Sequence, residues 1–413
     1  MLISGIARSN GGLARRMGHR ACAGVRAREA RLAIGLSHAF GIVAVCGSAL
    51  HAQLRKPVVR DSSGVRIVEY VSISGELPRL RVADKPFLDL GGLKANPSDE
   101  FDPGHPMLEA TRLSDGRIVV NDMARLMFFT RSGEFLRAVG RKGRGPGEFT
   151  QLGRICRLQG DTLLAIDWSE RRLSLWDSSG KLIRAFARPG EVSLDSCFPD
   201  GTVVIPDYSG RQRASDSGPS PTQRYDGRVE YLRIRPDGTV IQSLGRHARS
   251  EFVGGQSYIV TMIAGSDRYY VADRHRYELK VFDVVSGLRL VLRVTEALPT
   301  VQARLISPQK SPPRAGRATE AQRAPGSPIT RPAFGSVRVD PAGRIWVQSY
   351  SAQQEWTVFD SSGVLIGRIR LEARTAKGRV SALSGVERDY IVLRERDEDD
   401  AVHLAFYRTS VSP

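Results

Sequence analysis

Four aspartates recur at one position of a repeated segment, and carboxylates are the side chains in this sequence best suited to hold a hard cation. Each one ends a short apolar run that follows a turn. The four are Asp122, Asp167, Asp207 and Asp273, and Ser349 stands at the same place in a fifth repeat. Carboxylates from neighbouring repeats that meet at one point would bind calcium. Such a site would suit a calcium-dependent hydrolase or lactonase.

The same aspartates also have a structural explanation. Aspartate side chains commonly accept hydrogen bonds from backbone amides two residues ahead in a loop. Arginines follow three of them, at Arg125, Arg171 and Arg276. A residue that recurs in every repeat is more typical of a structural role than of catalysis. We therefore expect these aspartates to order loops, assign no catalytic residue and no cofactor, and keep the calcium enzyme as the alternative.

Three aromatic residues directly follow the repeated aspartate or its equivalent. They are Trp168, Tyr208 and Tyr350. Side chains just beyond a strand lie in loops, and loops on a rigid scaffold commonly carry binding residues. We predict that these three are partly exposed on one face and contact a ligand.

A glycine-rich run at residues 140–147 carries Arg141, Lys142 and Arg144. A phosphate-binding loop needs glycines that open a helix, whereas this run leaves a predicted strand, contains Pro146 and leads into another strand. The run therefore predicts a connection between two repeats. Its three cations are candidate contacts for an acidic partner.

Two kinds of hairpin alternate along the chain. The first is a short strand, a Gly/Asp turn and an apolar strand. Alternating apolar residues with a Gly-containing turn indicate a β-hairpin. Its six occurrences are LSDGRIVVND (113–122), LQGDTLLAID (158–167), FPDGTVVIPD (198–207), AGSDRYYVAD (264–273), DPAGRIWVQS (340–349) and the degenerate SGVERDYIVL (384–393).

The second hairpin follows the first and carries Ser-Gly or Asp-Gly at its turn. An aromatic residue recurs at one of its strand positions, as Phe128, Trp176, Phe282 and Phe359, and predicts a core between sheets. Two hairpins make a four-stranded antiparallel unit. The occurrences are LMFFTRSGEFLRAVG (126–140), LSLWDSSGKLIRAFA (173–187), YLRIRPDGTVIQSLG (231–245), LKVFDVVSGLRLVLR (279–293) and WTVFDSSGVLIGRIR (356–370).

The spacing of these units predicts an all-β, six-bladed β-propeller over residues 65–410. Two polar insertions, 209–228 and 295–332, account for the long intervals between units. We expect the second to form a flap or short helix over one mouth of the ring, or a disordered connection. The last unit lacks an outer strand, and residues 65–71 and 87–90 are predicted to supply it. Closure of this kind removes exposed sheet edges.

The N-terminus predicts export. Arginines up to Arg31 precede an apolar stretch at 32–50, and small and polar residues follow at 51–53, which is typical of a secretory signal. We expect residues 1–52 to be a signal peptide and 53–64 a linker. The mature protein would then be periplasmic, attached to the cell envelope or secreted, with no membrane span. A retained membrane anchor is the alternative.

The charge distribution and the cysteines indicate which kinds of partner the protein has. The formal charge is +17, but the arginines are scattered among acidic residues and form no stripe interleaved with aromatic residues, so we expect no nucleic-acid partner. Cys156 and Cys197 are the two cysteines left after signal cleavage. They fit no CxxC metal spacing. We expect two buried free thiols, with a disulfide in an oxidising compartment as the alternative.

The segments DGRIVV, RLMFFTRSGEFL and GRKGRGPGEF resemble NHL-type repeats and the secreted six-bladed β-propeller proteins of bacteria. The resemblance covers roughly residues 65–410 and implies the same fold. It specifies function poorly, because propellers include both binding modules and enzymes. We expect an exported, non-enzymatic propeller that binds a protein, peptide or glycan through its loop face.

Overall fold

The computed structural model describes residues 56–75, 77–92, 100–105, 107–187, 197–207, 228–248, 252–253, 256–257, 261–296, 300–302, 328–330, 332–371 and 379–410. These lie in the unit Ala52–Pro413. The predicted signal peptide, Tyr208 and most of both insertions lie outside the described residues. No helix among the described residues is long and apolar enough to cross a membrane.

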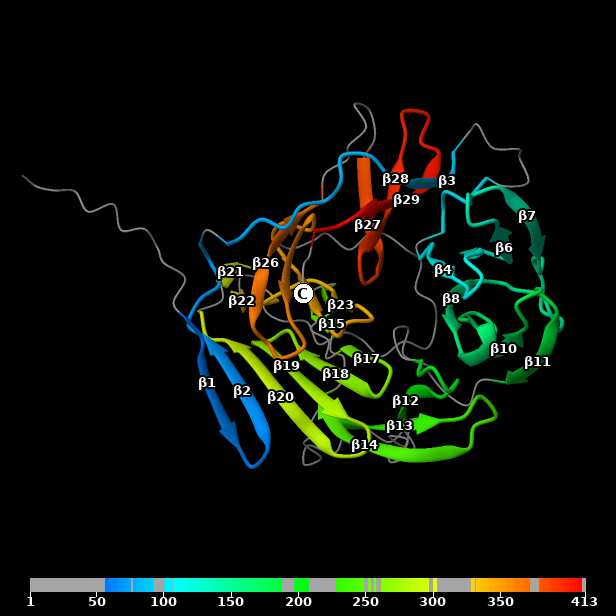
Figure 1. Cartoon of the computed structure of the whole chain (residues 1–413). Coiled ribbons are helices and arrows are strands. Elements are labelled where there is room, and N and C mark those ends of the chain that lie inside the picture. The colour runs from blue at the N-terminus through cyan, green and yellow to red at the C-terminus, as the bar shows by residue number, and fades with distance from the viewer. Residues whose placement is uncertain are drawn as a thin grey trace, which may run out of the picture. The chain divides into compact units, whose positions relative to one another are not determined.

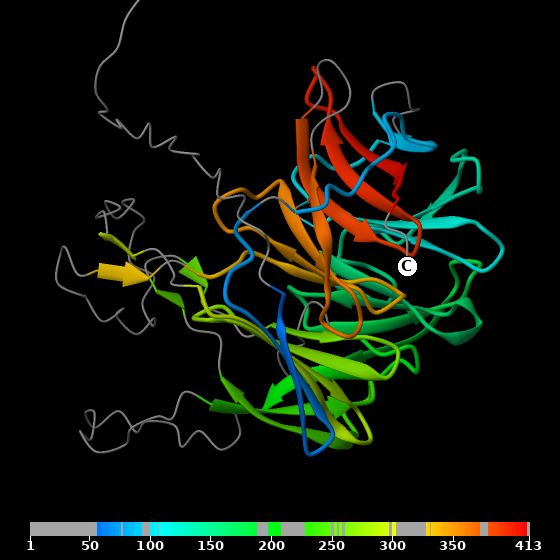
Figure 2. The same cartoon turned by 60° about the vertical axis from the view of Figure 1, so that its left-hand side comes forward.

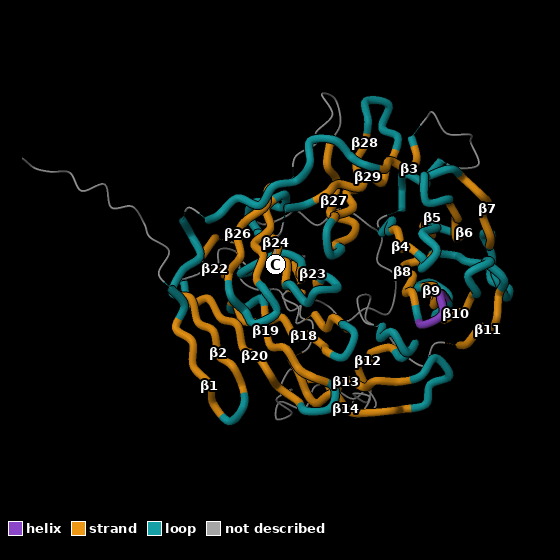
Figure 3. The backbone as a smooth tube through the Cα atoms, in the orientation of Figure 1, coloured by secondary structure: helices purple, strands orange, loops and turns teal. Residues whose placement is uncertain are grey.

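The structure is a ring of six β-sheets, as predicted, and Figures 1 and 3 show the sheets arranged around a centre. Blades 1 and 2 each have four antiparallel strands in chain order. Blade 1 consists of β4 (Ala110–Arg112), β5 (Ile118–Asp122), β6 (Arg125–Phe129) and β7 (Phe135–Val139). Blade 2 consists of β8 (Leu152–Arg157), β9 (Leu163–Asp167), β10 (Arg172–Trp176) and β11 (Leu182–Ala187), with a short 3-10 helix η1 (Gln159–Asp161) after β8.

Blade 3 departs from this pattern, whereas blade 4 keeps its four strands within a larger sheet. Blade 3 has β12 (Val203–Asp207), β13 (Arg228–Ile234) and β14 (Val240–Ala248), and Cys197 forms a single β-bridge to Val203 at its inner side. Blade 4 has β17 (Thr261–Ala264), β18 (Arg268–Asp273), β19 (Tyr277–Asp283) and β20 (Gly287–Val294). Two short antiparallel pairs stand apart, β15 (Phe252–Val253) with β16 (Gln256–Ser257), and β21 (Thr300–Gln302) with β22 (Pro328–Thr330).

Blades 5 and 6 complete the ring. Blade 5 has β23 (Val337–Val339), β24 (Ile345–Gln348), β25 (Glu355–Phe359) and β26 (Leu365–Arg370). Blade 6 has β27 (Arg379–Val386), β28 (Tyr390–Arg396), β29 (Val402–Arg408) and, as its fourth strand, β3 (Leu88–Gly91) from the N-terminal part of the chain. The prediction that residues 87–90 close the last blade is therefore confirmed.

The prediction for residues 65–71 is wrong. These residues form β2 (Val65–Tyr70), which pairs in parallel with β20 of blade 4, and β1 (Val58–Ser62) pairs with β2 inside the segment expected to be a linker. The alternating apolar pattern of β2 predicts a strand but not its neighbour. Val68 and Tyr70 are buried against blade 4 and blade 5, and this burial decides the pairing.

After β2 the chain continues along the outer edges of the next two blades. Arg79 forms a β-bridge with Arg368 of β26, and Val82 forms one with Thr409 beside β29. The phenol of Tyr70 accepts a hydrogen bond from the Leu365 amide at 2.7 Å. We call residues 58–91 the N-terminal belt. Figure 2 shows its blue strands and connecting segment crossing the outer side of blades 4 to 6.

Six hydrophobic clusters hold the ring, one between each pair of adjacent blades. Phe128, Trp176 and Phe359 are buried in them, and Phe282 stacks on Tyr269 with ring centroids 4.7 Å apart. The predicted aromatic core between sheets is thus confirmed. Gly180, with φ +83, sits so close to Phe128 that an added Cβ would lie 3.0 Å from its ring, so the turn and the core both require glycine there.

Candidate functional site

A cavity of about 930 Å³ opens at the centre of the ring. Residues from all six blades line it, because the inner strands and the turns of the first hairpins face the centre (Figure 3). The charged and tyrosine side chains along it are Glu109, Arg112, Arg154, Arg157, Asp267, Arg268, Tyr270, Arg338, Asp340, Glu387 and Tyr390. The cavity wall is therefore polar and contains both signs of charge.

One group of charges links three blades. Glu109, which precedes β4, is buried and lies 3.6 Å from Nε of Arg154 on β8 and 3.1 Å from an arginine nitrogen of Arg338 on β23. These pairs satisfy the carboxylate. Buried carboxylates need such partners, since an unpaired buried charge costs several kcal/mol. This group therefore stabilises the cavity wall.

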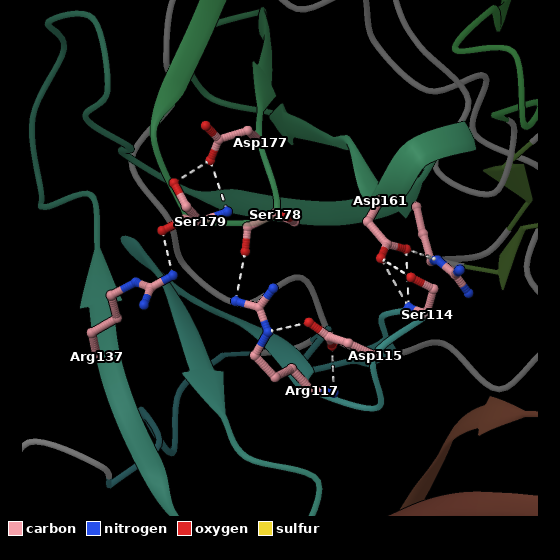
Figure 4. Close-up of polar contacts among 9 residues, drawn as sticks. Ser114, Asp115, Arg117, Arg137, Asp161, Asp177, Ser178 and Ser179 are labelled. Carbon is pink, nitrogen blue, oxygen red and sulfur yellow. Dashed lines mark hydrogen bonds and ion pairs between the residues drawn. The ribbon is translucent and has the colours of Figure 1, made fainter.

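A second group joins blades 1 and 2, as Figure 4 shows. The carboxylate of Asp161 accepts hydrogen bonds from the Ser114 amide, at 3.0 Å, and from the Ser114 hydroxyl, and it pairs with Arg157 at 2.6 Å. Burial alone would raise the pKa of Asp161, but these hydrogen bonds hold it below its usual value. Arg117 of blade 1 also donates to the Ser178 carbonyl of blade 2 at 2.9 Å. These contacts fix the junction at the cavity mouth.

A third group contains a buried polar atom that lacks a hydrogen-bond partner among the described residues. Arg112 is the last residue of β4, and its buried Nε has no hydrogen-bond partner among the described residues. Its guanidinium carbon lies 5.7 Å from the centre of the Tyr390 ring on β28. Glu387, in the turn before β28, lines the same cavity. Burial, followed by the charges of Asp340 and Asp389, raises the pKa of Glu387 to about 7.

The cavity wall also contains a disulfide between Cys156 of β8 and Cys197 at the inner side of blade 3. The expectation of two free thiols is therefore wrong. The sequence places the two cysteines in neighbouring repeats, but only the packing of blade 2 against blade 3 brings their Cα atoms to 6.5 Å. The bridge ties the short inner segment of blade 3 to blade 2.

The repeated aspartates lie at the ends of β5, β9, β12 and β18, and the hydrogen bonds of three of them order loops. Asp122 accepts from the Asp102 amide and pairs with Arg125; Asp167 accepts from the Thr150 and Glu170 amides; Asp273 accepts from the His275 amide and pairs with Arg276. Within the described ranges no three His, Cys, Asp or Glu side chains lie close enough to share a metal ion. Asp122, Asp167, Asp207 and Asp273 thus do not converge, and this donor set does not fit one calcium ion.

The other predicted binding residues that the structure describes do not line the cavity. The Trp168 indole packs over Gly153, where an added Cβ would lie 2.3 Å from the ring, and Tyr350 is half-buried after β24. Arg141 and Arg144 are largely exposed and pair with Glu148 and Glu170, and Lys142 forms a β-bridge with Phe149. As predicted, the run 140–147 connects blade 1 to blade 2.

Sequence reasoning missed Arg112 and Glu387. A signal for Arg112 exists, because Arg112 and Arg157 both precede the first-hairpin turn, in TRLSDG and CRLQGD. Inner-strand residues next to this turn line the cavity in blades 1 and 2. Glu387 has no such signal, because it lies in the degenerate sixth repeat.

Comparisons with known proteins agree with the fold. A family model described as "6-bladed beta-propeller" matches residues 107–191, the part of the chain that contains blades 1 and 2. No curated protein matches the chain. A protein from Bacteroides fragilis NCTC 9343, described as a "putative exported protein", has a similar structure at 12% identity, with 83% of this chain and 99% of that chain covered and a TM-score of 0.51.

A second solved structure is a gluconolactonase from Xanthomonas campestris. It is 12% identical, with 86% of this chain and 95% of that chain covered and a TM-score of 0.37. The ring of six sheets, together with the matching family model, gives the chain the architecture of a six-bladed β-propeller. The narrower resemblance to NHL-type repeats and to secreted bacterial proteins stays a prediction.

Proposed function

We propose that this protein is an exported binding module that takes a polar, charged ligand, such as the end of a peptide or glycan, into its central cavity. The observation that carries the proposal is the wall of the 930 Å³ cavity, where Arg112, whose buried Nε has no hydrogen-bond partner among the described residues, lies with Glu387. Cavities of this size bind small ligands, and a few polar groups set their specificity. A buried donor without a partner costs free energy, which a ligand can recover.

The residues that line the cavity favour binding of a ligand without chemical turnover. Among the described residues along the cavity there is no histidine, and both cysteines are joined in a disulfide. The Ser114 and Ser384 hydroxyls donate to the Asp161 carboxylate and the Leu108 carbonyl. A serine or cysteine nucleophile beside a histidine base, the usual arrangement for acyl transfer, is thus not assembled from these residues.

Export has support from two directions. Residues 1–52 have the arginine-rich, then apolar pattern of a secretory signal. The Cys156–Cys197 disulfide supports an oxidising compartment, because reducing systems keep cytosolic thiols free. Expression of the full chain in a bacterial host, followed by fractionation and mass measurement, tests export. We expect a periplasmic form that lacks about the first 52 residues, and deletion of residues 32–50 should keep the protein in the cytoplasm.

Two tryptophan variants test the cavity. Ala342 is an exposed turn residue that lines the cavity, whereas Ser132 is an exposed turn residue outside it. Ligands are the tripeptide Gly-Gly-Ala and trigalacturonic acid, measured by isothermal titration calorimetry. We expect at least one to bind, A342W to abolish that binding and S132W to retain it.

Three results would overturn the proposal. The first is that neither ligand binds at millimolar concentration. The second is that A342W binds as tightly as the original protein, which would place the ligand outside the cavity. Turnover of a lactone such as δ-gluconolactone by the folded protein would replace binding with hydrolysis. In that case Glu387, whose pKa of about 7 suits a general acid or base, is the first residue to change.

A further inference from the structure

Arg112 is held in position by an aromatic ring and not by an acidic side chain of the described residues. Its Nε is buried and lacks a hydrogen bond, and no ion pair of this side chain is present among the described residues. The Tyr390 ring, 5.7 Å from the guanidinium carbon, supports the guanidinium by a cation–π contact. A guanidinium fixed in this way presents a planar set of N–H donors, which match the two oxygens of a carboxylate.

Tyr390 and Glu387 belong to one hairpin. The Glu387 amide donates to the Tyr390 carbonyl at 2.9 Å, so the two side chains are carried by the same turn between β27 and β28. The Tyr390 ring is buried, while its residue lines the cavity. Burial raises the pKa of its phenol to about 12, so the phenol is a hydrogen-bond donor at any physiological pH.

The charges around Glu387 come from four elements. Asp340, after β23, and Asp389, in the same turn as Glu387, oppose its ionisation, whereas Arg112 of β4 and Arg157 of β8 favour it. Asp340 forms an ion pair with Arg344 at 2.5 Å and accepts a hydrogen bond from the Trp346 indole. Arg157 forms an ion pair with Asp161. Arg112 is thus the cation of this set without a carboxylate of its own. The carboxyl of Glu387 changes charge near pH 7.

We propose that Arg112, Glu387 and Tyr390 form a subsite for a carboxylate group of the ligand. This inference rests on the proposed function and adds the chemical class of the ligand. Arg112 donates to the ligand carboxylate, and the neutral Glu387 carboxyl and the Tyr390 phenol supply further donors. A phosphate dianion is less favoured, because each additional negative charge is brought beside Glu387, Asp340 and Asp389.

The subsite also makes binding depend on pH. Below pH 7 Glu387 is neutral and donates a proton to the hydrogen bond with the ligand. Above pH 7 it is ionised, repels the ligand carboxylate and competes for Arg112. If only the neutral form binds, the affinity for a carboxylate falls about tenfold between pH 6 and pH 8. Ligand carboxyls themselves stay ionised over this range, since their ordinary pKa values lie near 4.

Pairs of acids and uncharged counterparts test the subsite. The pairs are Gly-Gly-Ala and its C-terminal amide, and trigalacturonic acid and its methyl ester, measured by calorimetry at pH 6 and pH 8. Whichever acid binds identifies the source of the carboxylate as a peptide or a uronic acid. We expect that acid to bind at least tenfold more tightly than its uncharged counterpart, because a hydrogen bond to a charged group contributes roughly that much affinity.

Three variants complete the experiment. R112Q should weaken binding of the acid tenfold or more and leave the uncharged counterpart unaffected, whereas R131Q, an exposed arginine at a turn of the same blade, should change neither. E387Q should retain binding and lose the fall between pH 6 and pH 8. Thermal unfolding confirms that each variant is folded.

The outcomes separate the two proposals. If A342W abolishes binding while R112Q and E387Q leave it and its pH dependence unchanged, the cavity binds a ligand but the carboxylate subsite is wrong. Equal affinity for acid and counterpart overturns the subsite as well. If A342W, R112Q and E387Q all bind like the original protein, both proposals fail.

Discussion

Blades 1 to 3 and blades 4 to 6 share one repeat but differ in what covers their outer edges. Leu136, Ile183 and Ile241 occupy equivalent positions of β7, β11 and β14 and are 44%, 55% and 42% exposed. The equivalent Ile366 of blade 5 packs into the cluster that contains Val82 of the N-terminal belt. The belt thus buries edges that are open on the other half. The repeated sequence specifies the blades, and the added N-terminal segment decides which of their outer edges are buried.

The first-hairpin turns show the same contrast. In blade 1 the pair Asp115–Arg117 is solvent-accessible, with 48% and 27% of the two side chains exposed. In blade 5 Asp340 and Arg344 are almost fully buried and bonded to each other. The arginine after the turn glycine thus forms a surface ion pair in one half and a buried one in the other, with an aspartate from a different position of the turn in each. Such pairs differ greatly in what their loss costs.

The largest effect should come from breaking the buried pair. D340A leaves Arg344 buried without its partner, and we expect the free energy of unfolding to fall by about 3–5 kcal/mol. D115A in blade 1 should change it by no more than about 1 kcal/mol. Urea denaturation of both variants measures the difference. Equal losses would show that burial of the turn does not distinguish the two halves.

Truncation of one leucine in each half should give the next largest difference. Leu90 of β3 is buried in the cluster between blades 6 and 1, so L90A should lower the free energy of unfolding by about 2–5 kcal/mol. L136A, on the open edge of blade 1, should cost less than about 0.5 kcal/mol. If L90A is as mild as L136A, β3 does not close the ring in solution.

The disulfide lies in the half of the ring whose outer edges the belt leaves open. The Cys156–Cys197 bridge closes a loop with a sequence separation of 41 residues, and it holds the inner side of blade 3. The variant C156S/C197S should lose about 2–4 kcal/mol. Unfolding of the original protein with and without a reducing agent provides a second measurement. A reducing agent that has no effect on the original protein would contradict the bridge.

The smallest effect concerns His403 at the seam between blade 6 and the belt. Nδ1 of His403 lies 3.2 Å from Asp89 of β3, and Nε2 lies 3.2 Å from Asp397. These carboxylates, Asp89 first, raise the pKa of His403 to about 9 against the opposing effect of burial. Because the folded pKa exceeds the unfolded one, the stabilisation is complete below about pH 6.5 and is lost as the pH rises through 9.

We expect this loss to be about 1–2 kcal/mol between pH 6 and pH 10, since the two aspartates are partly exposed and solvent screens the pair. H403Q should lower stability at pH 6 and approach the original protein at pH 10, which separates His403 from the other groups that titrate there. Denaturation at the two pH values measures it. A difference between the two proteins that does not change with pH would contradict the role of His403.

Some residues of the core and loops could be predicted from the sequence, whereas the residues of the cavity could not. The aromatic positions Phe128, Trp176 and Phe359 were predicted to be core and are buried, because strand alternation and recurrence identify a face that neighbours must cover. Three of the repeated aspartates, Asp122, Asp167 and Asp273, accept hydrogen bonds from loop amides, as their local hydrogen-bonding capacity suggested. Arg112 and Glu387 were not singled out, because nothing local marks two charged residues from the first and last blades as neighbours.

The strands, their pairing within each hairpin and the number of blades follow from the sequence alone, because alternation and turn residues act over a few positions. The tertiary structure alone decided three other things: β2 pairs with β20 instead of blade 6, Cys156 is bonded to Cys197, and Arg112 meets Tyr390 and Glu387 in one cavity. Each of these depends on which blades become neighbours when the ring closes. That choice is made by the burial of whole sheet faces, which local patterns do not encode.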